Sequence, residues 1–256
     1  MSDTEITYDL SLLDESSRAW QQSEALRLFY GDLYSEIGRH CVGSSLLEIG
    51  SGIGVSSDFI KHVTTTDLVK TKYVDRAMSA YAIEPTESGS GWTSIFALDM
   101  LHHLREPFKF LASASQCLEA NGRIVLLEPA ATWLGRIFYK LFHHEPIEPR
   151  EIGSPFEFEA NGTDGEFANM GMGVGLFVRN EAVVSERLQA MGLKVLCIRY
   201  RDIIGYPLTG GYSAGQNAPT SVVRLCLRLE KALPQWLLKR LGLRMCVVLE
   251  KTSDGV

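Results

Sequence analysis

The stretch LLEIGSGIG, residues 46–54, decides the fold of this chain. Leu46 to Ile49 has the length and apolar character of a short buried strand, and the three alternating glycines that follow predict a tight turn into a helix over residues 54–62. Glycine lets the backbone approach a ligand closely, and the free N–H groups at the start of such a helix suit a carboxylate. The stretch therefore predicts a strand, loop and helix that together bind a small ligand.

Strands and helices alternate along most of the chain. Further strands are predicted at residues 63–66, 93–98, 123–127 and 194–200, and helices at 15–39, from Pro107 onward, at 180–191 and at 221–240. The local signals are Pro107 in a first helical turn, an Asn121-Gly122 turn, Asn180 as a helix cap and Gly192 as a helix end. Such alternation predicts an α/β fold with a doubly wound, mostly parallel sheet.

Length and composition indicate one domain, residues 1–256. Residues 15–40 contain an amphipathic helix, which we expect to close over the ligand as an N-terminal cap. Residues 130–176 and 202–220 interrupt the alternation with long, glycine-containing loops. Because ligands bind at the carboxyl ends of strands in open α/β sheets, we expect 130–176 to be a lid insertion over the substrate pocket. Surface loops without a function are the alternative.

Charge and composition exclude several classes of protein. Lysine plus arginine number 25 and aspartate plus glutamate 31, a net charge of −6 that disfavours nucleic acid as a partner. The five cysteines are scattered without a C-x-x-C pair, which argues against a disulfide framework and a zinc site and favours a reducing, cytoplasmic location. The acidic N-terminus is neither a signal nor a transit peptide, and no apolar run reaches the roughly 18 residues of a spanning helix.

Two common nucleotide-binding motifs are absent from the glycine stretch. A dinucleotide fingerprint needs a glycine at position 55, which is Val55, and no G-K-[ST] follows to make a P-loop. Asp67, just past the second predicted strand and about 20 residues beyond the loop, can accept hydrogen bonds from two ribose hydroxyls. The sequence therefore predicts a nucleoside ligand that is neither NAD nor ATP.

Four motifs in order carry a resemblance to a known family. They are E-x-G-x-G-x-G after the first strand, an acid after the second, ALDMLHHL at residues 97–104 and LEANGR at residues 118–123. Over residues 46–129 the chain resembles class I, Rossmann-like methyltransferases that depend on S-adenosylmethionine (SAM), of the bacterial type 11 kind. The resemblance implies a seven-stranded sheet, with residues 243–250 as an antiparallel last strand at or near an edge. It also implies SAM (S-adenosyl-L-methionine) as cofactor and methyl transfer as the reaction.

The resemblance implies, position by position, which residues hold SAM. Glu48 and the loop glycines would surround the methionine moiety, Asp67 the ribose, and residues 99–101 the methionine and sulfonium. The family commonly places an acid and a small residue after the third strand to touch adenine; here the pair is Ser79-Ala80, with Asp75 earlier, so a weaker hydroxyl contact is expected. The predicted cofactor-binding residues are Glu48, Gly50, Ser51, Gly52, Gly54, Asp67, Leu68, Ser79, Ala80, Asp99, Met100 and Leu101.

Histidines are the candidate catalytic bases. The sulfonium of SAM is already activated, so the site must align the acceptor and, for a hydroxyl, remove its proton. His102 and His103 follow the strand at 93–98, and His143 and His144, next to Glu145, begin the insertion. We expect one of each pair to reach the pocket, with a structural or surface role as the alternative. The i, i+4 spacing of H-E-x-x-H is absent, so no metal is predicted.

Helix 221–240 is predicted to be amphipathic and basic. Its apolar side is expected to cover the sheet, and contact with a membrane surface or a lipid-phosphate carrier is the alternative. The predicted apolar side consists of Val222, Leu225, Leu229 and Leu233, and the solvated side of Arg224, Arg228 and Lys231.

The acceptor is predicted from a looser resemblance of the C-terminal half. FYKLFHHEP at residues 138–146 and TGGYS at 209–213 resemble bacterial methyltransferases found among surface-polysaccharide functions. This favours an oxygen, and less a nitrogen, of a small molecule such as a saccharide or lipid-linked saccharide. Two rivals stay open: a SAM-binding pseudoenzyme or protein-interaction module, and another reaction on SAM such as decarboxylation or cyclisation. The oligomeric state is not predicted.

Overall fold

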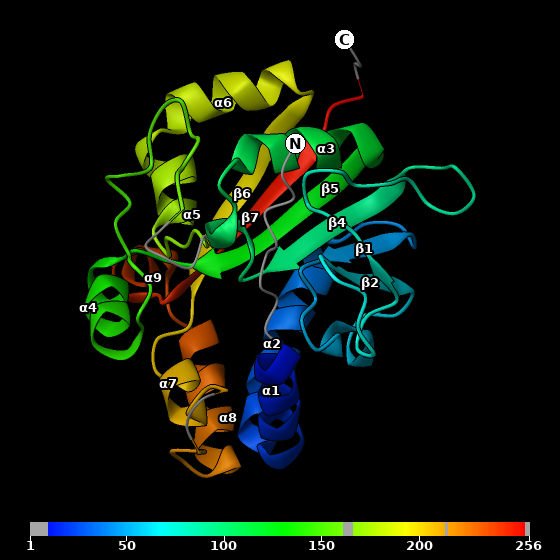
Figure 1. Ribbon diagram of the computed structural model, residues 1–256. Helices are drawn as coiled ribbons and strands as arrows, with labels where there is room; N and C mark the ends of the chain where they lie inside the picture. The colour runs from blue at the N-terminus through cyan, green and yellow to red at the C-terminus, as the bar shows by residue number, and fades with distance from the viewer. Residues whose placement is uncertain (1–9, 161–165, 213–214, 254–256) are drawn as a thin grey trace.

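The computed structural model describes residues 10–160, 166–212 and 215–253, so most of the acidic N-terminus, residues 161–165 of the insertion and Ser213 lie outside it. Within these residues the strands form one seven-stranded sheet in the order β3-β2-β1-β4-β5-β7-β6 (Figure 1). The strands are β1 (Leu46–Ile49), β2 (Val63–Asp67), β3 (Arg76–Ala77), β4 (Trp92–Leu98), β5 (Leu118–Pro129), β6 (Leu193–Arg201) and β7 (Arg244–Lys251). Among these strands β7 alone runs opposite to the others, one place in from the edge strand β6. The predicted doubly wound, mostly parallel sheet is confirmed, as is the antiparallel last strand near an edge.

Helices cover both faces of the sheet, as Figure 1 shows. The longer ones are α1 (Leu10–Gln22), α2 (Glu24–His40), α3 (Pro107–Cys117), α4 (Trp133–Phe142), α6 (Glu181–Ala190), α8 (Thr220–Lys231) and α9 (Gln235–Leu241). The shorter ones are η1 (Val55–Asp58), η2 (Leu101–His103), α5 (Met172–Val174), η4 (Gly175–Arg179) and α7 (Gly205–Thr209). Pro107 begins α3, as predicted. Asn180 occupies the cap position of α6, but its side chain makes no capping hydrogen bond and donates instead to the carbonyls of Ile152 and Gly175.

Alternate residues of the strands pack into two separate hydrophobic cores, one on each face of the sheet. In β4, Ile95 and Ala97 join the cluster under α3 and α6, whereas Phe96 and Leu98 join the cluster under α2 and α8. Successive side chains of a strand point to opposite faces, so a strand buried on both faces is apolar throughout. The residues predicted to turn at Asn121-Gly122 lie inside β5, where Asn121 has a left-handed φ of 61°.

The helix predicted over residues 54–62 is wrong. The glycine loop is followed by η1, a single 3-10 turn of four residues. Ser56 donates its hydroxyl to the Glu48 carboxylate and Ser57 donates its hydroxyl to the Gly54 carbonyl. Serine side chains that bond locally in this way compete with a helical ladder. The glycine loop is therefore not followed by a full helix whose N-terminus could face the ligand carboxylate.

Two long predicted helices are each divided. The segment 15–39 spans α1 and α2, which part at Ser23, where the serine hydroxyl accepts from the N–H of Leu26 and caps α2. The segment 221–240 spans α8 and α9, which part before Pro234, because proline cannot donate into a helical ladder and begins α9 as its cap residue.

The predicted buried side of α8 is also wrong. Val222, Leu225 and Leu229 are exposed, whereas Val223 and Leu227 are buried. The helix packs mainly on α2 and α7. Its orientation is set by Glu230, whose carboxylate accepts from the N–H groups of residues 204 and 205 at the start of α7. An apolar stripe of α8 is therefore left facing outward.

The insertion 130–176 contributes to the core as well as to the surface. Ile152, Phe156 and Phe167 are buried in the cluster under α3 and α6. Helix α4, by contrast, exposes Trp133 and Phe142, with 67% and 70% of their surfaces accessible. In the part of the chain that the structure describes, no helix combines the length and apolarity that crossing a membrane requires.

Candidate active site

The carboxyl ends of the parallel strands meet at one edge of the sheet. The chain passes from β1 outward to β2 and β3 and then returns to β4 and β5 on the other side of β1. Such a switch point opens a crevice where ligands bind in doubly wound folds. β7 begins at this same edge because it is antiparallel, and its Arg244 pairs with Pro129 at the end of β5.

The glycine loop needs its glycines for distinct reasons. Gly50, Gly52 and Gly54 have φ angles of 74°, 54° and 66°, in the left-handed region that side chains disfavour. A Cβ on Gly54 would lie 2.0 Å from the carbonyl oxygen of Tyr73, whereas one on Gly52 would meet nothing within 4 Å. Gly54 is therefore required by packing, and Gly52 leaves its side of the loop open.

Two carboxylates at the strand ends hold this loop. Asp67 accepts from the N–H of Gly52 at 2.8 Å and from the N–H of Leu68 at 2.7 Å. Glu48 is buried and accepts from the hydroxyls of Tyr34, at 3.1 Å, and Ser56, at 2.5 Å. Burial raises the pKa of Glu48, while these two hydroxyls act against that rise. Both predicted residues lie at the loop, with Glu48 turned into the protein.

The remaining predicted cofactor residues lie around the same edge. Ser79 and Ala80 are half-buried just beyond β3, and the N–H of Met78 donates to the Asp67 carbonyl at 2.7 Å. Asp75 is committed elsewhere, since it accepts from both the N–H and the hydroxyl of Thr65. The predicted loop and strand-end residues not yet placed are Ser51, which is buried, Leu68, which is exposed, and Met100 and Leu101, which are buried.

Glu128, at the end of β5, organises the segment after β4. Its carboxylate accepts from the N–H groups of Met100, Leu101 and His102, at 3.0, 2.8 and 3.3 Å. It also accepts from Nδ1 of His102 at 2.7 Å. Burial opposes a charge on His102, yet the adjacent Glu128 carboxylate outweighs it, so the pKa of His102 is raised. The imidazole is thereby fixed with Nε2 pointing away from Glu128.

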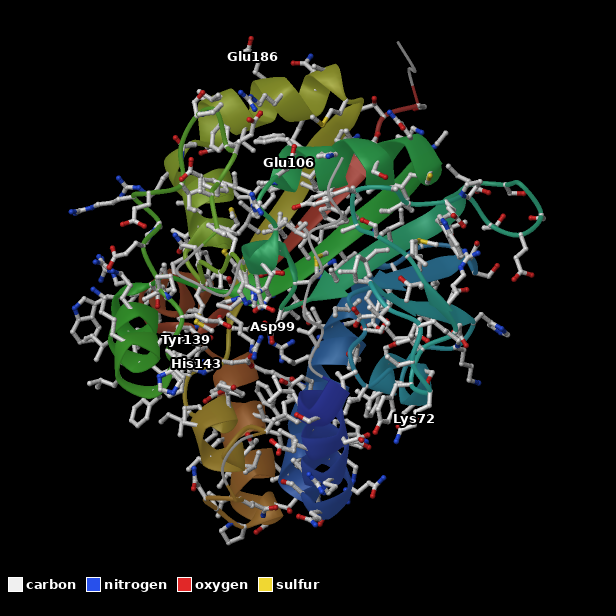
Figure 2. All side chains as sticks on the ribbon, in the orientation of Figure 1. Lys72, Asp99, Glu106, Tyr139, His143 and Glu186 are labelled. Carbon is white, nitrogen blue, oxygen red and sulfur yellow. The ribbon has the colours of Figure 1, made fainter. Side chains whose placement is uncertain are left out.

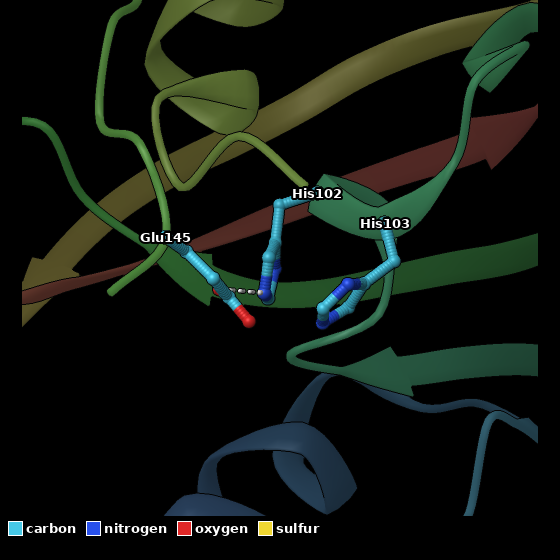
Figure 3. Close-up of side chains that lie close together, drawn as sticks. All are labelled: His102, His103 and Glu145. Atoms are coloured by element: carbon cyan, nitrogen blue, oxygen red, sulfur yellow. Dashed lines mark ion pairs between the residues drawn. The ribbon is translucent and has the colours of Figure 1, made fainter. Parts of the chain in front are cut away.

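His102, His103 and Glu145 form a cluster, which we call the His–His–Glu cluster (Figure 3). Nε2 of His102 lies 3.6 Å from Oε2 of Glu145, and the two histidine rings are 4.2 Å apart between centroids. One donor atom from each residue lies within 4.8 Å of the others. His102 is buried and His103 exposed; burial, and then the neighbouring His102, lower the pKa of His103.

The second predicted histidine pair is not brought into this cluster. His143 ends α4 and its ring lies against Tyr139, 5.2 Å between centroids, while His144 is exposed. Burial lowers the pKa of His143. Of the segment 143–145, the acidic residue is the one that reaches His102.

Asp99 and Arg244 form an ion pair beside the cluster. Arg244 is 3% exposed, and its guanidinium lies over the ring of Tyr206, 5.0 Å from the centroid. Burial would lower its pKa, but the charge of Asp99 raises it well above the ordinary value. In Figure 2, Asp99 lies below the strand tips, with Tyr139 and His143 beside α4. The site thus holds a desolvated cation.

Sequence reasoning missed Glu128, Arg244 and the tertiary role of Glu145. A signal for Glu128 was present, because it ends an apolar strand in an acid as Glu48 and Asp67 do. The signal for Arg244 was weaker: it is a charged residue directly before the apolar run of residues 245–249 in β7.

A family model described as a methyltransferase domain matches residues 21–197. No curated protein matches. Similar solved structures include a magnesium protoporphyrin IX methyltransferase from Synechocystis PCC 6803 with bound SAH, at 10% identity and a TM-score of 0.49, covering 95% of this chain and 96% of that one. A SAM-dependent methyltransferase from Archaeoglobus fulgidus is 11% identical with a TM-score of 0.49, covering 88% and 94%.

Proposed function

The chain belongs to the methyltransferase domain family, and we propose that it moves the methyl group of SAM to an oxygen of a small-molecule acceptor. SAM is the methyl donor. The observation that carries the choice of oxygen is the His–His–Glu cluster, fixed by Glu128 at the same sheet edge as the glycine loop. A hydroxyl must lose its proton during methylation, and a positioned imidazole is the side chain suited to accept it near neutral pH.

The nucleoside side of the crevice supports SAM as the ligand. The open face of Gly52 gives a ligand access to the backbone, and Asp67 lies at the end of the neighbouring strand. In our proposal Asp67 exchanges its bond to the Gly52 N–H for the two ribose hydroxyls. Ser79 and Ala80 then face adenine, and Met100 and Leu101 the methionine end.

The acceptor side supports a division of labour between the two adjacent histidines. His102 is held by Glu128 on one nitrogen and faces Glu145 with the other, so it orients the cluster. His103 is the exposed member, and we assign it the acceptor proton. The O–CH3 bond forms as the S–CH3 bond breaks, the proton passes to His103, and S-adenosylhomocysteine leaves. His143, at the end of α4, is the second candidate base.

The surface beside the cluster supports an acceptor with an apolar part, such as a lipid-linked saccharide. Helix α4 leads directly into residues 143–145 and exposes Trp133, Leu141 and Phe142. The outward stripe of α8 adds Leu225 and Leu229 next to arginines. Exposed apolar side chains beside basic ones are typical of surfaces that meet lipid phosphates.

The test of this function measures cofactor binding and turnover separately. SAM and S-adenosylhomocysteine are titrated calorimetrically into the wild type, Asp67→Ala and Gly52→Val, and we expect micromolar binding that both variants lose. S-adenosylhomocysteine formation is then followed over a panel of free and lipid-linked saccharides. We expect His103→Ala to keep SAM binding and to slow turnover by about 100-fold or more, the usual share of a general base.

Three results would overturn parts of the proposal. Absent SAM binding would remove the enzyme and leave a protein-interaction module. SAM binding with turnover that survives His103→Ala would remove the assigned base. A product other than a methylated acceptor, such as decarboxylated SAM, would move the chain to another SAM reaction.

A further inference from the structure

The His–His–Glu cluster has the composition of a divalent metal site. Two imidazoles and one carboxylate are the protein ligands of one common catalytic zinc type, which keeps its fourth position open. The three residues come from two segments about 40 positions apart, so no spacing motif announces them. The fold brings the three side chains together from η2 and from the segment after α4 (Figure 3).

The separations suit ligands of one ion better than a hydrogen bond. At 3.6 Å, Nε2 of His102 and Oε2 of Glu145 are too far apart to share a proton well. Two ligands at zinc bond lengths in a tetrahedral arrangement lie about 3.4 Å apart. One donor atom of His103 lies within 4.8 Å of a donor atom of His102 and of one of Glu145, so a single ion can be shared by all three residues.

Glu128 provides the outer support that metal-bound histidines have. A histidine that ligates through Nε2 donates its Nδ1–H to a carboxylate, which fixes the tautomer and the ring. His102 makes this bond to Glu128 at 2.7 Å, and Glu128 is itself held by three backbone N–H groups. The direction in which Nε2 of His102 points is therefore fixed.

One oxygen of the Glu145 carboxylate, the one that faces His102, lacks a hydrogen-bond donor among the described residues. This atom, Oε2, is buried. A buried polar atom without a partner costs free energy. A cation between Oε2 and the two imidazoles would meet that need.

We propose that His102, His103 and Glu145 bind a divalent transition-metal ion, Zn²⁺ by the chemistry of the ligands. Imidazole nitrogen suits Zn²⁺, whereas Mg²⁺ and Ca²⁺ prefer all-oxygen sets. The location of the ion is independent of the proposed methyl transfer, but its role rests on it. With the ion bound, the acceptor hydroxyl occupies the open position, its proton leaves to solvent, and the metal takes over the part that His103 plays without it.

The test is a direct titration of the chelator-stripped full chain with Zn²⁺. We expect one equivalent to bind the wild type at micromolar or lower Kd, with His102→Ala, His103→Ala and Glu145→Gln each losing more than the roughly 10–100-fold that an outer-shell change costs. Co²⁺ supplies a second readout, since its visible absorption reports nitrogen coordination and should vanish in the same variants. His62→Asn is the matched control, because His62 is exposed and its φ of 59° suits asparagine.

The outcomes separate the metal from the methyl transfer. Glu145→Gln preserves shape at a side chain that is 36% exposed, so a folded variant is expected, and thermal melting checks it. No Zn²⁺ binding by the wild type, or binding unchanged in His102→Ala and Glu145→Gln, overturns the site and leaves a histidine ion-paired between two carboxylates. If Zn²⁺ binds as expected while no acceptor is methylated, only the proposed function fails.

Discussion

The two sides of the crevice are built by different means. On the β1–β2 side, the groups proposed to bind SAM belong to one loop of five residues and to Asp67, and most are backbone. On the β4–β5–β7 side, charged side chains come from separate parts of the chain: Asp99, His102, Glu128, Glu145 and Arg244.

The difference shows that the two sides depend on different parts of the sequence. A backbone cradle depends on φ angles and close approach, which a short contiguous motif fixes. In a cluster of buried charges, each charge needs a partner of opposite sign to offset the cost of its desolvation. Such partners can come from any part of the chain. The predictions below break one side at a time.

The largest effect is expected at Glu128. Glu128→Ala leaves His102 and three backbone N–H groups without their acceptor in a buried site, and breaking such a pair costs about 3–5 kcal/mol. Urea unfolding of wild type and variant measures this. Glu128→Gln keeps an acceptor oxygen and should lose clearly less. A loss below about 1 kcal/mol for Glu128→Ala would mean that β4 and β5 position His102 without it.

Removing Asp99 and removing Arg244 from their ion pair should destabilise the protein by different amounts. Asp99→Asn leaves Arg244 buried and uncompensated, a loss of about 3 kcal/mol, and asparagine tolerates the φ of 53° at this position. Arg244→Met removes the cation and keeps apolar bulk beside Tyr206, so it should lose less. Urea unfolding of both variants and of the double variant checks the order. A larger loss for Arg244→Met would show that stacking on the rings outweighs charge compensation.

The sequence predicted the β1–β2 side well because its signals are local. Gly50, Gly52 and Gly54 lie where expected, and Asp67 ends the second strand. The apolar runs of β4 and β5 likewise predicted strands of the sheet, since strands buried on both faces are apolar throughout. The count of seven strands came from the family resemblance.

The rest depended on tertiary contacts that no local pattern encodes. The prediction of a helix after the glycine loop was wrong because the hydroxyl of Ser56 donates to Glu48 and not within its own turn. The prediction of the buried side of α8 was wrong because the Glu230 carboxylate accepts from backbone N–H groups at the start of α7, and this orientation turns Leu229 outward. The His–His–Glu cluster escaped prediction because Glu145 reaches His102 only once α4 has folded back over the edge.

The loop glycines give the next effect. Gly54→Ala combines a left-handed φ with a Cβ placed 2.0 Å from the Tyr73 carbonyl, so we expect a loss of about 2–4 kcal/mol. Gly89→Ala is the matched control: its φ is 79°, but nothing lies within 4 Å of the new Cβ, and about 1–2 kcal/mol should be lost. Urea unfolding compares the two. Equal losses would mean that the loop shifts away from Tyr73 at little cost.

The smallest effect is expected for the pH dependence of stability that Glu48 causes. Glu48 is a buried carboxylate on the β1–β2 side, which is built mainly from backbone, so it can be compared directly with the carboxylates of the other side. Burial raises its pKa in the folded protein above the unfolded value of about 4.3. Between these two values the unfolded chain has released the proton and the folded chain still holds it, so the contribution of Glu48 to stability falls as pH rises. Relative to Glu48→Gln, which does not titrate, the wild type should therefore lose stability from pH 4 upward and level off above the raised pKa, as urea unfolding over pH 4–8 would measure. A difference that instead grows with pH would mean that the hydroxyls of Tyr34 and Ser56 outweigh desolvation, making Glu48 a charge held by partners in the manner of Glu128.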